Sequence, residues 1–288
     1  MSLFEKLLLK GNQESVPVLI FDINNKEADE EYPTTISKCW LHLKTIKKEA
    51  QFNQTYIDNI NKLMLDMAAW KKSRGDGNCY YRAVISTYFL KIFHPAISLE
   101  HLYNFINILT TLYNSYEYRE HIQEIKQIFD FVCEAYNSAA KNEDRYAKFI
   151  ETNRKLQEQK FDLALVRVAR VITYKTFKES CENDEDFKAF LLDEDKLQGY
   201  NRIQKMGVEA ETHDLVMLPK GLGIEVNQIN VFDKIVHYHY PKEDFTGSML
   251  KIWIICKLRG HYDALLSKSD LEIEKYNLKK RQYFYPRN

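Results

Sequence analysis

A long central segment without glycine is the feature that most limits what this chain can fold into. From Asn78 to Gln198 the sequence contains no glycine, and Pro95 is its single proline. Turns between strands rely on glycine and proline, because these residues supply the backbone angles that tight turns require. Helices that pack on one another need few such residues. The segment therefore predicts a helical half of the molecule.

Apolar residues recur at three- and four-residue intervals inside this segment, as expected for amphipathic helices. Two runs carry the pattern: Leu102, Phe105, Ile106, Leu109 and Leu112, and then Ile122, Ile125, Phe129, Val132 and Tyr136. A third stretch, 161–174, is apolar on most sides apart from Arg167 and Arg170. We expect it to form the most buried helix of this half.

The chain changes character after Gly199, where short apolar runs rich in β-branched residues are separated by glycine and proline. The runs are 224–232, 235–240, 250–258 and 262–266. They predict an antiparallel sheet, together with a helix at 210–218 that Pro219 ends. Upstream, a helix is predicted at 55–67 and a short strand at 16–21.

The charge and hydropathy of the chain argue against nucleic acid and membrane partners. The sequence has 41 Lys and Arg residues and 41 Asp and Glu residues, so its net charge is zero and exerts no long-range attraction on a polyanion. The most apolar stretch, 249–258, contains two lysines and is about half as long as the ~20 residues that a membrane-spanning helix needs. The N-terminal segment has no apolar run long enough for a signal peptide.

The cysteines predict free thiols. Cys39, Cys79, Cys133, Cys181 and Cys256 are odd in number, widely spaced and without a CxxC pair, so neither a disulfide framework nor a thiolate zinc site is indicated. A reducing compartment suits this pattern. The chain is therefore expected in the cytoplasm, or in a host cytosol if a bacterium secretes it as an effector.

The sharpest local signal is the segment 75–83, which reads Gly-Asp-Gly-Asn-Cys-Tyr-Tyr-Arg-Ala. The apolar spacing that follows predicts a helix beginning at about Cys79, with Asn78 as its N-cap. The free amides and the positive dipole end at a helix N-terminus stabilise a thiolate over a thiol, and a thiolate is a nucleophile. The two glycines allow backbone N–H groups in 76–79 to converge on one point, as an oxyanion hole requires.

His261 is the best partner for such a nucleophile among the eight histidines. It follows Gly260 at a break between two β-like runs, where a side chain can project from the end of a sheet. In an extended segment residues i and i+2 point the same way, so Asp263 can accept the second ring N–H of His261. The spacing therefore predicts a Cys79–His261–Asp263 triad.

Two separate motifs resemble one known family. Residues 76–83 resemble the Asp-Gly-Asn-Cys-aromatic-aromatic-Arg-Ala signature of ovarian-tumour (OTU) cysteine proteases of the otubain type, the peptidase C65 family. Residues 259–265 look like the otubain histidine segment, and 206–213 resemble the family's glutamate-rich lead into a helix. The motifs occur in the family's order and cover roughly 53–268.

This resemblance implies a fold and a domain organisation. The implied fold is a papain-like α/β (α+β) OTU domain with a small antiparallel sheet, a nucleophile helix and an inserted helical lobe at about 95–198. The implied boundaries are an N-terminal extension at 1–52, the catalytic domain at 53–270 and a C-terminal tail at 271–288.

The resemblance also implies an activity, that of a deubiquitinase that cleaves isopeptide bonds in polyubiquitin. The implied catalytic residues are Cys79, His261, Asp263 and Asp76, and the implied oxyanion loop contains Gly77 and Asn78. In these roles Cys79 is the nucleophile, His261 the general base and acid, and Asp263 the residue that orients the histidine. Ubiquitin, polyubiquitin and a ubiquitin-conjugating enzyme are the implied partners of a monomer, and no cofactor is implied.

Two positions depart from the family's pattern. Arg259 stands where the family usually has a proline, and Val84 stands where it usually has an aromatic residue. The first departure predicts a less rigid histidine loop, because proline restricts the backbone.

Other readings of the same sequence remain open. The chain is alternatively a noncatalytic protein that binds ubiquitin or a ubiquitin-conjugating enzyme, or a protease for a ubiquitin-like modifier. His237 and His239 share one face of a strand, but no acidic or cysteine ligands accompany them, so a surface pair is expected and no metal site. The basic aromatic run 279–285 is interpreted as a solvated or docked tail rather than a nucleic-acid site.

Overall fold

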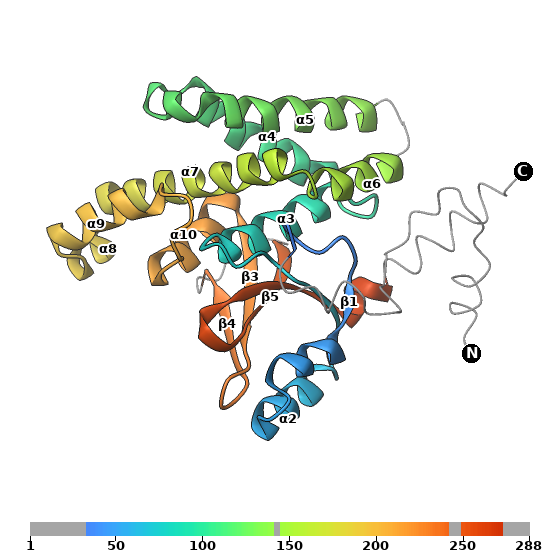
Figure 1. Cartoon of the computed structure of the whole chain (residues 1–288). Helices are drawn as coiled ribbons and strands as arrows, with labels where there is room; N and C mark the ends of the chain where they lie inside the picture. The colour runs from blue at the N-terminus through green and yellow to red at the C-terminus, as the bar shows by residue number, and fades with distance from the viewer. Residues whose placement is uncertain (1–32, 141–144, 242–248, 273–288) are drawn as a thin grey trace, which may run out of the picture.

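The computed structural model describes residues 33–140, 145–241 and 249–272. The strand expected at 16–21 and the tail run 279–285 lie outside the described residues. Within the described part of the chain, helices pack over one face of a twisted sheet, and a shorter helical segment lies on the other side (Figure 1). The sequence-based division into helical and β-rich halves is thus confirmed.

The described sheet has six strands in the order β1-β2-β6-β5-β3-β4. Their bounds are β1 (Leu41–His42), β2 (Met67–Lys71), β3 (Ile224–Asn230), β4 (Val236–Tyr240), β5 (Leu250–Cys256) and β6 (Tyr262–Ser267). All the strand runs expected after residue 199 form strands. The sheet is mixed rather than antiparallel, however, because β3 and β5 run parallel. β4 pairs antiparallel with one edge of β3, and β5 lies along the other edge of β3. Because β5 follows an antiparallel strand, it runs in the same direction as β3.

Helices account for most of the remaining described chain. The α-helices are α2 (Gln54–Leu63), α3 (Cys79–Phe93), α4 (Leu99–Asn114), α5 (Ile122–Ala140), α6 (Arg145–Lys155), α7 (Gln159–Asn183), α8 (Glu185–Phe190), α9 (Asp193–Ile203) and α10 (Thr212–Leu222). Short 3-10 helices are η1 (Leu43–Ala50), η2 (Tyr116–His121) and η3 (Leu258–Gly260). The two amphipathic runs form α4 and α5, and the stretch 161–174 lies within α7, where most of its side chains are buried. The expectation that this stretch forms the most buried helix is wrong, because α3 is buried on nearly all sides between the sheet and the other helices.

Two predicted helix ends are wrong, each for a tertiary reason. The helix expected to reach Met67 ends at Leu63, because Met67 begins β2 and pairs with β6. The helix expected to stop at Pro219 continues to Leu222. A proline inside a helix leaves the carbonyl four residues earlier without its usual donor.

A tyrosine from α3 compensates for that missing donor. The Tyr80 hydroxyl lies 3.3 Å from the carbonyl oxygen of Leu215, the residue four positions before Pro219, and donates to it. The hydroxyl is equally close to the Asp214 carbonyl. Helix α10 ends at Leu222, and its C-cap residue Gly223 has a φ of 65°, which suits glycine.

Helix α3 lies between the sheet and the outer helices (Figure 1). Almost every one of its side chains is buried, in a core shared with α4, α5, α7 and the sheet. A second core on the opposite sheet face joins η1 and α2 to the strands. Residues 33–52 thus contribute strand β1 and helix η1 to the structure, and the domain boundaries proposed at residues 53 and 270 stay predictions.

Candidate active site

Cys79 is the first residue of α3, as the sequence predicts, and its side chain is largely buried. The preceding loop brings the chain from β2 across the end of the sheet to the helix start. A thiol here lies at the positive end of a 15-residue helix.

His261 and Asp263 lie next to each other at the start of β6, on the same face, as the two-residue spacing predicts. The Nε2 atom of His261 is 3.1 Å from Oδ1 of Asp263. Asp263 is completely buried, and the same oxygen accepts a hydrogen bond from the backbone N–H of Ser73 at 2.6 Å. These contacts orient the ring and leave Nδ1 as the nitrogen available to other partners.

Cys79 also interacts with the His261 side chain. Burial alone would lower the pKa of His261, but hydrogen bonds and charge interactions with Asp263 and Cys79 raise it to about 10. The pKa of Asp263 is lowered, because the charge of Lys257 and the hydrogen bond from His261 outweigh its burial. The structure therefore brings Cys79, His261 and Asp263 together; this set is called the candidate triad below.

Asp76 faces an arginine of α3 and not the histidine. Its two carboxylate oxygens accept from Arg82 Nη1 at 2.8 Å and Nη2 at 2.9 Å, and Oδ1 also accepts from the Asn78 N–H at 3.1 Å. Burial would raise the pKa of Asp76, but the Arg82 hydrogen bond and charge lower it. Arg82 is buried and also binds Asp162 of α7 through Nε at 2.9 Å. Asp76 thus holds the loop before α3 through its carboxylate, which binds both Arg82 and the Asn78 N–H.

Gly77 lies directly against a second glycine loop. Its φ is 75°, and an added Cβ would come within 2.1 Å of the Gly207 carbonyl oxygen. Both the backbone angle and the contact exclude a side chain at this position. The segment 206–213, which was selected only for its resemblance, therefore supports the Cys79 loop from the other side.

Asn78 is the N-cap residue of α3, as the sequence predicts, but its side chain does not cap the helix. No hydrogen bond joins its side chain to the first turn of the helix. Its Oδ1 instead accepts from the Gly207 N–H at 3.0 Å and from Arg170 Nη2 and Nε at 2.8 and 3.1 Å. Buried Arg170 attracts the amide more strongly than the helix amides do, because charged donors make stronger hydrogen bonds.

A model of the peptidase C65 otubain family matches residues 27–267. The chain belongs to the otubain family. No curated protein sequence gives a significant match to it.

Solved structures resemble this otubain over most of its length. The structure of h/ceOTUB1 with ubiquitin aldehyde and UBC13~Ub has a TM-score of 0.65 and 18% identity, covering 86% of this chain and 95% of that one. The h/ceOTUB1 complex with ubiquitin aldehyde and UBCH5B~Ub has a TM-score of 0.64 and 17% identity, covering 85% and 94%. The ceOTUB1 complex with ubiquitin aldehyde and UBC13~Ub has a TM-score of 0.63 and 17% identity, covering 85% and 97%. At these identities the likeness establishes the OTU fold.

The structure also explains one departure of this otubain from the family's pattern. Arg259, in place of the usual proline, has a φ of 65°. Proline is locked near −65° and could not adopt this conformation. The turn is held by hydrogen bonds between Lys257 and the loop, with its N–H donating to the His261 carbonyl at 2.8 Å. The histidine loop therefore has its own means of support.

Sequence reasoning missed two buried cations beside the candidate triad. Arg170 appeared only as an interruption of an apolar helix, and Lys257 only as a charge within the run 250–258. A charged residue inside an otherwise apolar run is a signal for such a role, because it is buried only with a partner. The partner itself cannot be read from the run.

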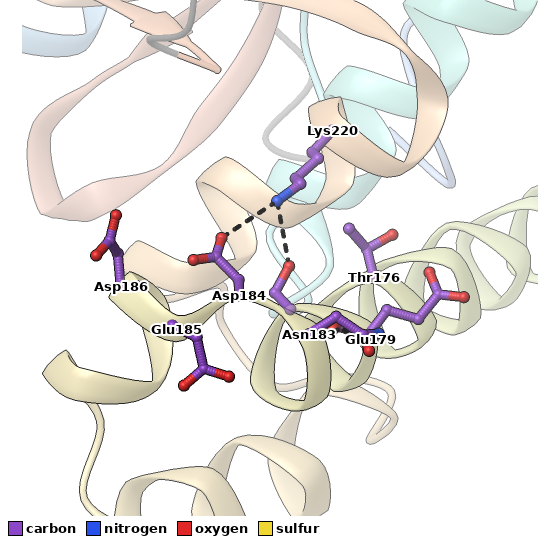
Figure 2. A pocket seen from close by; sticks show the side chains of 8 residues that line it. Thr176, Glu179, Asn183, Asp184, Glu185, Asp186 and Lys220 are labelled. Atoms are coloured by element: carbon purple, nitrogen blue, oxygen red, sulfur yellow. Dashed lines mark hydrogen bonds and ion pairs between the residues drawn. The ribbon is translucent and has the colours of Figure 1, made fainter.

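A surface cavity of about 620 Å³ lies at the end of α7 (Figure 2), and no candidate triad residue lines it. Half of the residues that line it are acidic, and Lys220 of α10 contacts Asp184 there at 3.8 Å. No group of three or more His, Cys, Asp or Glu side chains in the described ranges could hold a metal ion. Nor is any helix among the described residues long and apolar enough to cross a membrane.

Proposed function

We propose that this otubain is a deubiquitinase, a cysteine isopeptidase that hydrolyses the bond between the ubiquitin C-terminus and a lysine. The observation that carries the proposal is the candidate triad, in which Cys79 at a helix N-terminus interacts with a histidine that a buried aspartate orients. A fixed nucleophile, base and orienting residue are the components of covalent acyl transfer.

In the proposed reaction the Cys79 thiolate attacks the carbonyl carbon of the isopeptide bond, and a tetrahedral oxyanion forms. Backbone N–H groups of the loop containing Gly77 and Cys79 would stabilise that charge, whereas the N–H of Asn78 already donates to Asp76. The His261 imidazolium then gives its proton to the departing lysine amine, and a thioester remains on Cys79.

Water completes the cycle. Neutral His261 takes a proton from the attacking water and the thioester breaks, which restores the Cys79 thiolate and the His261 imidazolium. The ubiquitin C-terminus leaves as a carboxylic acid that releases its proton to solvent. Asp263 keeps the ring oriented in both steps. Thiol chemistry of this kind requires no cofactor.

Ubiquitin is the proposed substrate because the similar otubain structures were solved with ubiquitin aldehyde. The test is to incubate the protein with ubiquitin bearing a thiol-reactive C-terminal group and to follow the mass of the product. We expect an adduct of one ubiquitin on the native chain and none on Cys79→Ala. A correctly folded native protein that forms no adduct would exclude this function, and a panel of ubiquitin-like modifiers with the same group would then test the other protease reading.

A second candidate function is noncatalytic binding to a ubiquitin-conjugating enzyme. It is favoured by the presence of UBC13~Ub and UBCH5B~Ub in the similar structures. The distinguishing measurement is inhibition of ubiquitin transfer by such an enzyme in a reconstituted reaction. Inhibition that Cys79→Ala retains supports binding, whereas inhibition that it loses supports catalysis.

A further inference from the structure

Lys257 is buried directly behind the aspartate of the candidate triad. It follows β5, has only 4% of its surface exposed, and places Nζ 2.6 Å from Oδ2 of Asp263. The same ammonium group lies 2.7 Å from both carboxylate oxygens of Glu49 in η1 and 4.6 Å from the centre of the Trp70 ring. A lysine so enclosed stays charged only because carboxylates surround it.

We propose that the Glu49–Lys257 ion pair positions the Asp263 carboxylate and tunes its negative charge, an inference that rests on the proposed function. Lys257 touches Asp263 and not the reacting atoms, so it is a positioning residue.

The positioning follows from how the two oxygens of Asp263 are used. Oδ1 accepts from Ser73 N–H and His261 Nε2, and Oδ2 contacts Lys257. The two hydrogen bonds on Oδ1 and the ion pair on Oδ2 together oppose rotation of the carboxylate about its bond to Cβ. A carboxylate fixed in this way holds the imidazole in one orientation, which is what an acyl-transfer site needs.

The tuning follows from the order of charges. Glu49, Lys257, Asp263 and His261 alternate in sign along one line of contacts. Without Glu49, the positive charge of Lys257 would weaken the attraction between Asp263 and the His261 imidazolium. Glu49 offsets that effect, so the aspartate remains effective toward the histidine.

Other groups face this set from the surrounding elements. They are the Tyr56 hydroxyl of α2, whose pKa is raised by burial and by the charges of Glu49 and Asp263; Cys79 of α3; and Cys256 and Tyr262 of β5 and β6. Burial raises the pKa of Cys256 to about 11, and that of Tyr262 is raised as well. These groups are neutral near pH 7, except for the proposed thiolate of Cys79.

Two substitutions test the tuning, because one removes a positive charge and the other a negative charge near Asp263. Lys257→Met removes a positive charge, so the pH at which His261 loses its proton should rise by about one unit. Glu49→Gln removes a negative charge, so that pH should fall by a similar amount. The measurement is NMR titration of the His261 ring, whose signal is the one absent from His261→Asn.

The rate of adduct formation with thiol-reactive ubiquitin provides the second readout. Lys257→Met releases one oxygen of Asp263 and should slow the reaction about tenfold. Glu49→Gln leaves the Lys257–Asp263 contact in place and should change the rate by no more than about threefold. If Lys257→Met does not fold, circular dichroism will show it. In that case the His261 titration of Glu49→Gln alone tests whether the ion pair tunes Asp263, since the Glu49 side chain is one-third exposed and its substitution is tolerated more easily.

Lys148 of α6 offers a matched control. It contacts Glu134 at 2.9 Å and Glu151 at 3.0 Å and lies 4.6 Å from the centre of the Phe131 ring. Lys148→Met thus removes a lysine that also contacts two carboxylates and an aromatic ring, but in the helical region. It should change neither the titration of His261 nor the rate of adduct formation.

The outcomes distinguish this inference from the proposed function. If neither active-site variant moves the His261 titration further than Lys148→Met does, the ion pair does not tune the site and the inference is wrong. If the titration moves in the two expected directions while the native protein forms no ubiquitin adduct, the inference stands and the proposed substrate is wrong.

Discussion

Arg170 donates two hydrogen bonds to the side-chain oxygen of Asn78, at 2.8 and 3.1 Å, across the interface between α7 and the Cys79 loop. The same guanidinium reaches the carbonyl oxygens of Ile203 and Gly77 at 2.9 and 3.2 Å. One buried cation therefore connects the loop before the proposed nucleophile to a helix of the outer layer.

Removing this cation should loosen the loop. Arg170→Met leaves Asn78 Oδ1 with only one donor among the described residues, the Gly207 N–H. It also deprives the Ile203 and Gly77 carbonyl groups of the Arg170 donor. We therefore expect a loss of about 2–4 kcal/mol in unfolding free energy and about a tenfold slower reaction with thiol-reactive ubiquitin. Urea unfolding and adduct kinetics measure the two effects. The control is Arg167→Met, which lies in the same helix as Arg170 and loses a contact to the Gln204 carbonyl. Equal losses of stability and rate in both variants would contradict a specific role of Arg170.

The contact between Gly77 and Gly207 gives a second prediction. Gly77→Ala combines a positive φ with a backbone clash, so it should destabilise the protein by more than about 1–2 kcal/mol and reduce adduct formation at least tenfold. Gly223 has a φ of 65° and open space around its Cα. Gly223→Ala therefore measures the cost of the backbone angle alone, and a Gly77→Ala variant as mild as this control would show that the loop contact is unimportant.

Stability should depend on pH through His261. The folded state raises the pKa of this residue from 6.5 to about 10, so it binds the proton more tightly than the unfolded state does. Its contribution is fully present below about pH 6.5 and is lost as the pH rises through 10. Between these values the melting temperature of the native protein should fall more steeply than that of His261→Asn. Parallel curves would show that the histidine is not stabilised as an imidazolium.

The turn before His261 gives a prediction about the family residue. Arg259→Pro requires φ to change from 65° to about −65°, so restoring the family's proline should disrupt the histidine loop and slow adduct formation about tenfold or more. Arg259→Gly fits the observed angle and should react at close to the native rate. A fully active Arg259→Pro protein would show that the loop tolerates another conformation.

Local sequence determined a large part of this protein. The start of α3 at Cys79, the amphipathic helices α4 and α5, and the common face of His261 and Asp263 all follow from periodicities of 3.6 and 2 residues, which depend only on near neighbours. The two motifs also identified the otubain family, which the match over 27–267 confirms.

Tertiary structure alone decided how these parts meet. The parallel pairing of β3 with β5, the continuation of α10 through Pro219 and the use of Asn78 by Arg170 depend on groups far apart in the sequence. The contact of Lys257 with Glu49 and Asp263 arises because η1 packs on the sheet face behind β6. A buried charge or an unpaired carbonyl requires a partner, but which residue supplies it is set by packing and strand order, which no local pattern records.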